Sequence, residues 1–134
     1  MISIDRLLTN INQRGRATDT AVAAAEEELG LKLPADFVQF LKSGNGGEGF
    51  IGRKYVIFWG VEELPSINES YEVQQCAPGL LIFASSGGGE AYGFDTRKAP
   101  WPVVRVPFIG MEWGVAEIIG RSFSEFLVCL HEAG

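Results

Sequence analysis

Residues 80–95 read LLIFASSGGGEAYGFD, and this stretch indicates the fold more strongly than any other part of the chain. Its first part, Leu80–Ser85, is a short apolar run of strand length. Gly87–Gly89 then allows a tight reversal, because glycine accepts backbone conformations that other residues avoid. The last part, Glu90–Asp95, alternates as the side chains of a half-buried return strand do. The stretch therefore predicts an antiparallel β-hairpin.

Two further strands are expected on either side of this hairpin. Residues Tyr55–Trp59 are β-branched and aromatic, and Gly60 ends the run, as is typical of a short strand. Residues Val103–Val106 form a similar run that is fenced by prolines, and Pro107 marks its end or an exposed edge. The middle and later parts of the chain thus predict a sheet.

Apolar side chains recur at helical spacing near both ends of the chain. Capping residues support the assignments, since Thr18 or Asp19 can start one helix, and Gly30 can end it. Between the strands, the polar connection Val61–Pro78 predicts one or two short surface helices. The other predicted helices are Ile4–Ile11 with an end near Gly15, Ala21–Leu29, Pro34 to Gly44, and a C-terminal helix from Ser122 or Ser124 to Leu130.

Helices first, strands in the middle and a helix last predict the α+β class. We expect a mostly antiparallel sheet, with the N-terminal helices and the C-terminal helix packed on one face. The length of 134 residues allows one domain, residues 1–134, and folding can hide about two-thirds of the open chain's surface. A chain of this size needs no disulfide or metal to hold its core.

The composition indicates a cytoplasmic protein without a cofactor. No apolar run approaches the roughly 20 residues of a membrane-spanning helix, and the first residues lack the pattern of a secretory signal. Cys76 and Cys129 are far apart in sequence and are expected to be free thiols. One histidine, His131, and two dispersed cysteines do not make a zinc site or a nucleophile with its base.

Negative charge is concentrated in one part of the chain. The sequence has 17 acidic and 11 basic residues, and its net charge is −6. Residues 55–96 contain no lysine or arginine, which disfavours direct nucleic-acid binding. The excess either keeps the protein soluble or attracts a basic partner protein. The acidic residues of this part are Glu62, Glu63, Glu69, Glu72, Glu90 and Asp95.

Other side chains permit weaker hypotheses. Glu48, Glu90 and Asp95 are expected at turns or strand ends, where a pair of carboxylates could hydrolyse a carbohydrate. Solvated turn carboxylates are the simpler interpretation. The tryptophans are first of all core material, although Trp101 and Trp113 could also anchor a partner.

The segment from Ala25 to Leu41, AEEELGLKLPADFVQFL, followed by Asn45–Gly49, NGGEG, resembles the opening of the SUKH superfamily (Smi/Knr-type domains). The pattern is a glutamate-rich helix ending in Leu-Gly, a Leu-Pro helix start, an aromatic helix and Asn-Gly-Gly. Residues Gly88–Asp95 resemble the family's glycine turn and aromatic strand, and Ser122–Leu127 resembles its closing helix. The connection between residues 61 and 78 matches no family pattern.

This resemblance implies an α+β, non-enzymatic protein-binding domain. Its bacterial branch implies an immunity protein that neutralises a toxin, often a nuclease, and nuclease toxins tend to be basic. A housekeeping adaptor of the same fold is the alternative, and a carboxylate-based carbohydrate enzyme is a weaker one. We expect the partner to meet the connection of residues 61–78 and neighbouring loops. The candidate contacts are Glu62, Glu63, Glu69 and Glu72 for electrostatic steering and Tyr71, Trp101 and Trp113 as anchors.

Overall fold

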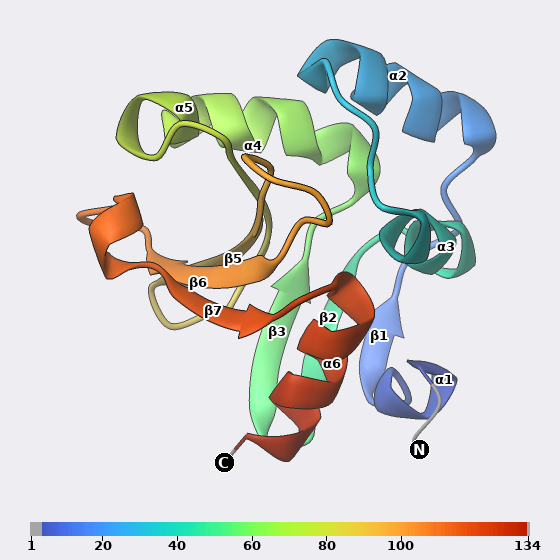
Figure 1. The fold of residues 1–134 in the computed structure, drawn as a ribbon. Helices are drawn as coiled ribbons and strands as arrows, with labels where there is room; N and C mark the ends of the chain where they lie inside the picture. Colours follow the sequence, from blue (N-terminus) through green and yellow to red (C-terminus); the bar gives the residue numbers. More distant parts are fainter. Residues whose placement is uncertain (1–3, 134) are drawn as a thin grey trace.

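The strands of the described chain pair in the order in which they occur, and every neighbouring pair is antiparallel. The structure, a computed structural model, describes residues 4–133 (Figure 1). The α+β class and the antiparallel sheet predicted from the sequence are confirmed. The strands are β1 (Ile11–Gln13), β2 (Gly47–Ile51), β3 (Lys54–Phe58), β4 (Leu80–Ser85), β5 (Glu90–Asp95), β6 (Val103–Pro107) and β7 (Glu117–Gly120).

The predicted caps start and end the helices. The Thr18 hydroxyl accepts a hydrogen bond of 3.0 Å from the Ala21 N–H, and the Ser122 hydroxyl accepts one of 3.1 Å from the Glu125 N–H. Gly30 ends its helix with a φ of 73°. The α-helices are α1 (Ile4–Leu7), α2 (Asp19–Leu29), α3 (Ala35–Ser43), α4 (Leu64–Ser70), α5 (Val73–Cys76) and α6 (Phe123–Glu132), and η1 (Val61–Glu63) and η2 (Trp113–Val115) are 3₁₀ turns.

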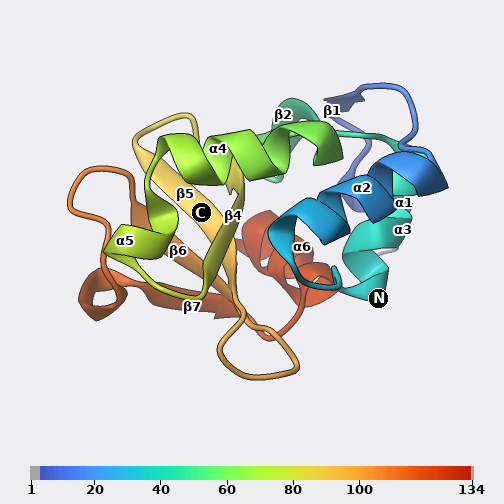
Figure 2. The same ribbon diagram turned by 90° about the horizontal axis from the view of Figure 1, so that it is seen from above.

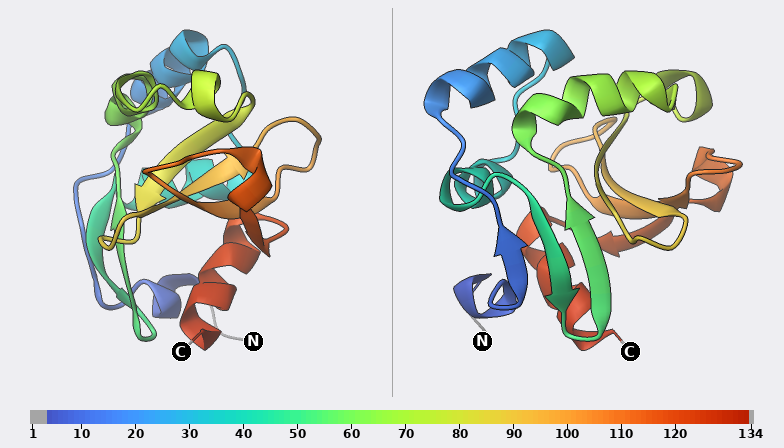
Figure 3. Two further views of the ribbon diagram at one scale, coloured as in Figure 1. Left: turned by 90° about the vertical axis from the view of Figure 1, so that its left-hand side faces the viewer. Right: turned by 180° about the vertical axis from the view of Figure 1, so that it is seen from behind.

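The N-terminal helices and α6 share one core, as expected, whereas α5 of the connection after β3 covers the other face of the sheet. Figure 3 shows α4 and α5 on the opposite side of the later strands from α6. Side chains of β4 alternate between two cores, as the pleat of a strand requires. Leu81 and Phe83 pack in the larger core, together with side chains of α2, α3 and α6. Leu80 and Ile82 pack in the second core, with side chains of α5 and of the loop before η2. The polar connection after β3 is therefore part of the fold, because its helix α5 covers the face of the sheet that carries Leu80 and Ile82.

Three segments differ from the sequence-based prediction. The helix expected to reach Ile11 ends at Leu7, and Ile11 begins β1. The glycine-rich segment after α3 forms β2 and a later segment forms β7, and neither strand was predicted. Pairing of β1 with β2 overrides the helical spacing, and it needs glycine. A Cβ atom at Gly47 would lie 2.4 Å from the Asn12 carbonyl oxygen, and one at Gly49 would lie 2.1 Å from that of Asn10.

Phenylalanine rings from α3, β3, β4, β5 and α6 fill the larger core. The ring of Phe123 lies 5.0 Å from the rings of both Phe37 and Phe40, measured between centroids, and 5.6 Å from Phe83. The carboxylate of Asp36 accepts two bonds of 2.9 Å from the N–H and hydroxyl of Ser124, which join α3 to the start of α6. This scaffold fixes the sheet on which the candidate site lies.

The sheet changes direction between β3 and β4. Only Ile57 and Phe58 of β3 pair with β4, opposite Ser85 and Ala84. Figure 1 shows that β1–β3 then run across the direction of β5–β7. The earlier part of β4 has lost its neighbour on this side, so its backbone groups need other partners.

Asn68 of α4 supplies these partners. Its side-chain amide donates to the Ile82 carbonyl oxygen at 2.9 Å and to the Leu64 carbonyl oxygen at 2.8 Å. Its side-chain oxygen accepts from the Ile82 N–H at 2.9 Å. The buried asparagine thus takes the place of a neighbouring strand and attaches α4 to the sheet.

We predict that Asn68→Ala lowers the free energy of unfolding by about 2 to 3 kcal/mol, because it leaves the buried N–H and C=O of Ile82 without partners. Urea unfolding monitored by circular dichroism measures the change. The control is Ser70→Ala, at an exposed position of the same helix. Equal stability of the two variants would contradict this role of Asn68.

Candidate protein-binding surface

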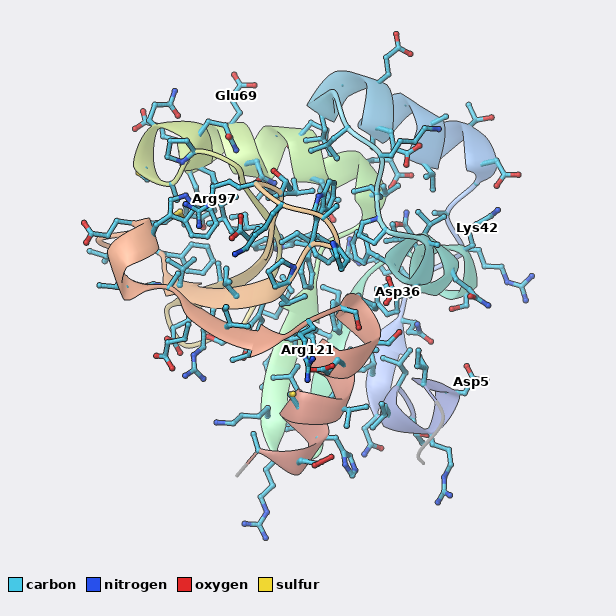
Figure 4. All side chains as sticks on the ribbon, viewed as in Figure 1. Asp5, Asp36, Lys42, Glu69, Arg97 and Arg121 are labelled. Carbon is cyan, nitrogen blue, oxygen red and sulfur yellow. The ribbon has the colours of Figure 1, made fainter. Side chains whose placement is uncertain are left out.

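The connection between β3 and β4 carries five of the seven residues predicted to contact a partner. Glu62 and Glu63 lie in η1, Glu69 lies in α4, and Tyr71 and Glu72 lie between α4 and α5. Figure 4 shows Glu69 pointing outward from α4. Its neighbour Asn68 faces the sheet, so the helix is attached on one side and exposes its charge on the other.

Three of the six carboxylates in residues 55–96 are held in ion pairs. Glu63 pairs with Arg14 at 3.0 Å and also accepts the Gly60 N–H at 2.7 Å. The other two carboxylates, Glu90 and Asp95, pair with Arg105 and Arg97. These arginines lower the local negative charge that the sequence predicts for this part of the chain.

The other three carboxylates are exposed and lie on the same connection. Within residues 4–133, no lysine or arginine forms an ion pair with Glu62, Glu69 or Glu72. Glu62 accepts a hydrogen bond of 2.6 Å from the Asn45 side chain. This bond fixes the position of the carboxylate but does not neutralise its charge, because the amide donor is uncharged. The unpaired negative charge of this part of the chain is therefore concentrated on η1, α4 and the turn after it.

The fold adds Glu28 of α2 to these carboxylates. Helices α2 and α4 contact each other and lie side by side (Figure 2). A shallow groove between them is lined by Glu28 and Glu69, with Leu29, Leu31 and Pro65 among its apolar residues. Sequence reasoning missed this neighbour, since nothing in the sequence shows which helix lies beside which. We call the exposed residues Glu28, Glu62, Glu69 and Glu72 the acidic surface.

Exposed apolar side chains lie at the α4–α5 end of this connection. Tyr71 is 48% exposed, and its ring centroid lies 4.7 Å from that of Phe108, which follows β6. The next residue, Ile109, is 92% exposed. Sequence reasoning missed Phe108 and Ile109, although an apolar pair between Pro107 and Gly110 stands where polar turn residues are usual.

Trp113 lies close to this end of the molecule, but its side chain is half-buried and already has partners. Its indole N–H donates to the Pro78 carbonyl oxygen at 2.8 Å, and the guanidinium of Arg97 lies 3.6 Å from the centroid of its ring. Arg97 also donates two hydrogen bonds of 3.0 and 3.1 Å to the buried carboxylate of Asp95. We call this set of contacts the Arg97 bridge. It joins the end of β5 to η2 and to the turn before β4.

Trp101 lies on the opposite face of the sheet from Trp113. Its half-buried ring packs against the larger core and lies 5.9 Å from the ring of Phe94. Trp113 and Phe108 pack against the second core. The structure therefore does not bring Trp101 together with Tyr71.

The three carboxylates of the enzyme hypothesis are held in separate contacts. The Tyr55 hydroxyl donates to Glu48, and this hydrogen bond raises the pKa of Tyr55, with smaller contributions from desolvation and the carboxylate's charge. Glu90 and Asp95 are held by different arginines, as described above. This arrangement gives the hypothesis of a carboxylate pair no support.

Among residues 4–133, no three or more histidine, cysteine, aspartate or glutamate side chains form a group that could hold a metal. In the same range, no helix has the length and apolar character needed to cross a membrane. Cys76 and Cys129 are free thiols at exposed positions. The pKa of Cys129 is raised, mainly because its thiol is partly desolvated and secondarily because of the nearby carboxylates.

The Arg97 bridge makes stability depend on pH. Burial alone would raise the pKa of Asp95, but the hydrogen bonds and charge of Arg97 outweigh it and hold the pKa below the ordinary 3.8. The folded protein therefore gains stability from this carboxylate above about pH 4 and loses it as the pH falls through the lowered pKa.

We predict that the urea concentration at the midpoint of unfolding decreases as the pH is lowered from about 4 through this pKa. Arg97→Met should lower the midpoint at neutral pH, because the ion pair is lost, and should make the midpoint depend less on pH in the acid range.

Lys98→Met is the matched control, because Lys98 is exposed and its charge makes the smallest of the contributions that lower the pKa of Asp95. It should leave most of the acid dependence in place. Identical pH profiles for wild type and Arg97→Met would contradict a stabilising role for this ion pair.

An exposed apolar centre with polar and charged residues around it is the usual arrangement of a surface that binds another protein. The fold and this surface define an α+β protein-binding domain. Residues 16–129 match the SMI1 / KNR4 family (SUKH-1), and the chain belongs to this family. No curated protein matches the chain at a significant level.

Proposed function

We propose that this chain is an immunity protein that acts in the cytoplasm and neutralises a basic toxin domain, such as a nuclease, by binding it. The acidic surface is the observation that carries the proposal. Its four glutamates come from α2, η1, α4 and the turn after α4, and the last three belong to the connection between β3 and β4. The motifs that resemble the family's opening and closing segments lie outside residues 61–78, so this connection can carry a partner-specific surface while the motif residues maintain the fold.

Charge on this surface would act mainly on the rate of association. Exposed charges interact weakly in water, but together they attract an oppositely charged protein and orient it before contact. Of the aromatic anchors proposed from the sequence, Tyr71 is adjacent to this charge and exposed. Trp113 would contribute mainly by holding the nearby loop, and Trp101 would serve only a partner that also reaches the other face.

The backbone at Glu72 supports a role for its side chain. Its φ of 53° is the only positive value among the non-glycine residues that the structure describes. Such a conformation costs a residue with a Cβ atom about 1 to 2 kcal/mol, and glycine would avoid that cost. A glutamate in this position therefore favours a functional reason for the carboxylate.

We predict that Glu72→Gly raises the free energy of unfolding by about 1 kcal/mol, because relief of backbone strain exceeds the added flexibility of the unfolded chain. The same variant should bind the toxin more weakly. Urea unfolding and surface plasmon resonance measure the two effects. Glu69→Gly is the control, since Glu69 lies within α4 and its substitution should destabilise the helix.

The charge proposal predicts a slower association rate when the acidic surface is reversed. Glu69→Lys combined with Glu72→Lys should slow binding to the toxin at least tenfold or so at low salt, and high salt should reduce the difference. The probe is a basic toxin domain that this chain neutralises on co-expression, and stopped-flow fluorescence measures the association rate. Asp5→Lys with Glu132→Lys changes the net charge equally and should change the rate much less. These two exposed residues belong to α1 and α6, which lie at the other end of the molecule from α4 and α5 (Figure 1).

Co-expression tests the immunity role itself. Cells that produce the toxin should survive only when this chain is also produced, and purified chain should inhibit the toxin in a one-to-one complex. A solitary gene with no neighbouring toxin would favour the adaptor alternative.

The charge-reversal experiment has its own contradicting outcome. If the Glu69/Glu72 and the Asp5/Glu132 double variants associate with the toxin at equal rates at low salt, the acidic surface does not steer the partner.

A further inference from the structure

The Tyr71–Ile109 cluster, defined as Tyr71, Phe108 and Ile109, is an apolar projection beside the acidic surface. Its residues come from two segments that are far apart in the sequence. The aromatic rings of Tyr71 and Phe108 are in contact, and Ile109 is 92% exposed at the adjoining turn. A side chain so exposed contributes almost nothing to the core, so the fold alone gives no reason for isoleucine there.

Contacts with the body of the protein hold Phe108 and the turn after it in place. The Phe108 N–H donates to the Gly89 carbonyl oxygen at 3.0 Å, and the Phe108 ring lies 6.4 Å from that of Trp59. Gly110, with a φ of 78°, turns the chain directly after Ile109. The Arg97 bridge fixes η2 a few residues later. Binding through such a surface loses less conformational entropy than binding through a mobile loop.

The charges around the cluster indicate what it meets. Residues 59–76 and 107–118, the two segments that supply the cluster, contain six glutamates and no lysine or arginine. Two of the six, Glu63 and Glu117, are paired with Arg14 and Arg105. Arg97 reaches Trp113 from another segment, but its charge is balanced by Asp95. The remaining negative charge disfavours a nucleic acid, an anionic membrane and a second copy of this acidic chain. It is complementary to a basic protein.

We infer that the Tyr71–Ile109 cluster is the apolar anchor of the interface, inserting into an apolar recess that is surrounded by lysine and arginine on the partner. The positive charge of that partner rests on the proposed function, whereas the anchor role of the cluster is argued from its exposure and contacts alone. Anchors of this kind lie in the desolvated centre of an interface and determine how long the complex lasts, whereas the surrounding charges determine how fast it forms.

Two other exposed apolar sites provide comparisons. Phe50 and Tyr55 contact each other on the β2–β3 hairpin, where Arg53 and Lys54 add positive charge to the turn. Ile118 is 68% exposed on β7, where Glu117 is paired. At the first site, Glu48 accepts the Tyr55 hydroxyl and has no ion pair among the described residues, but two basic residues of the same hairpin offset its charge. At the second site the carboxylate of Glu117 is paired, so neither site has the net negative charge of the Tyr71–Ile109 cluster.

Titration of the isotope-labelled protein with three peptides of equal length tests the inference by nuclear magnetic resonance. The first peptide combines lysine with leucine, the second combines lysine with serine, and the third combines glutamate with leucine. The lysine–leucine peptide should shift the amide signals of residues 71, 108 and 109. It should bind about tenfold more tightly than the lysine–serine peptide, and the glutamate–leucine peptide should not shift these signals.

Two variants complete the test. Ile109→Asp should weaken binding of the lysine–leucine peptide at least tenfold or so, and the exposure of this side chain means that the fold should be retained. Ile118→Asp introduces the same charge at another exposed isoleucine and should change the affinity less than about twofold. Equal losses in the two variants, signal shifts centred on Phe50 or Ile118, or no saturable binding of the lysine–leucine peptide would overturn the anchor.

The toxin assays separate this inference from the proposed function. Full protection of cells by Ile109→Asp, with unchanged toxin affinity, would reject the anchor and retain the immunity role. Binding of the lysine–leucine peptide at the cluster, together with no protection against the toxin by the unaltered chain, would retain the anchor and reject that role.

Discussion

β3 pairs with β4 over only two residues of each strand, and this short pairing determines where the candidate surface lies. Beyond it, the backbone of Ile82 must find hydrogen-bond partners away from β3, because a buried N–H or C=O without a partner is costly. The side chain of Asn68 provides both bonds. The next residue, Glu69, then points away from the sheet because successive residues of a helix face different directions. One buried amide thereby places an acidic helix on the second face.

The same constraint links the two parts of the surface. Helix α4 cannot move away from β4 without losing the bonds of Asn68, and Tyr71 at its end meets Phe108 from the loop after β6. The Arg97 bridge fixes that loop from the other end. A surface built from short segments on a rigid sheet can present charge and apolar groups together, as specific binding requires.

The sequence predicted the parts of the fold that depend on local patterns. The hairpin of residues 80–95 and the capped helices α2 and α6 follow from apolar spacing, glycine turns and hydroxyl caps. Strands β1 and β2 were not predicted, because three residues are too few for a pattern and Gly47 and Gly49 are unusual in a strand. Their pairing is a long-range event that no local propensity reports.

The candidate surface was predicted in part, for a similar reason. The excess of glutamates is visible in the sequence, but its neutralisation depends on distant partners, such as Arg14 for Glu63. The position of Glu28 beside Glu69 depends on helix packing. Only Phe108 and Ile109 had a local signal, which was an apolar pair at a turn. Sequence reasoning therefore identified the connection and overestimated its free charge.

The contacts explain why family membership says more about the fold than about the partner. Several polar residues of the matching motifs hold the chain together. Glu26 accepts the Leu33 N–H at 2.8 Å, Asn45 accepts the Val61 N–H at 2.8 Å, and Asp36 holds the start of α6. Their aromatic residues fill the larger core. The motifs are thus needed to build the scaffold, whereas Glu69 and Glu72 of the connection, whose side chains form no hydrogen bond or ion pair with the described residues, can change with little effect on it. Selection for a new partner would then act on η1, α4 and the following turn, while the sheet and its phenylalanine core stay the same.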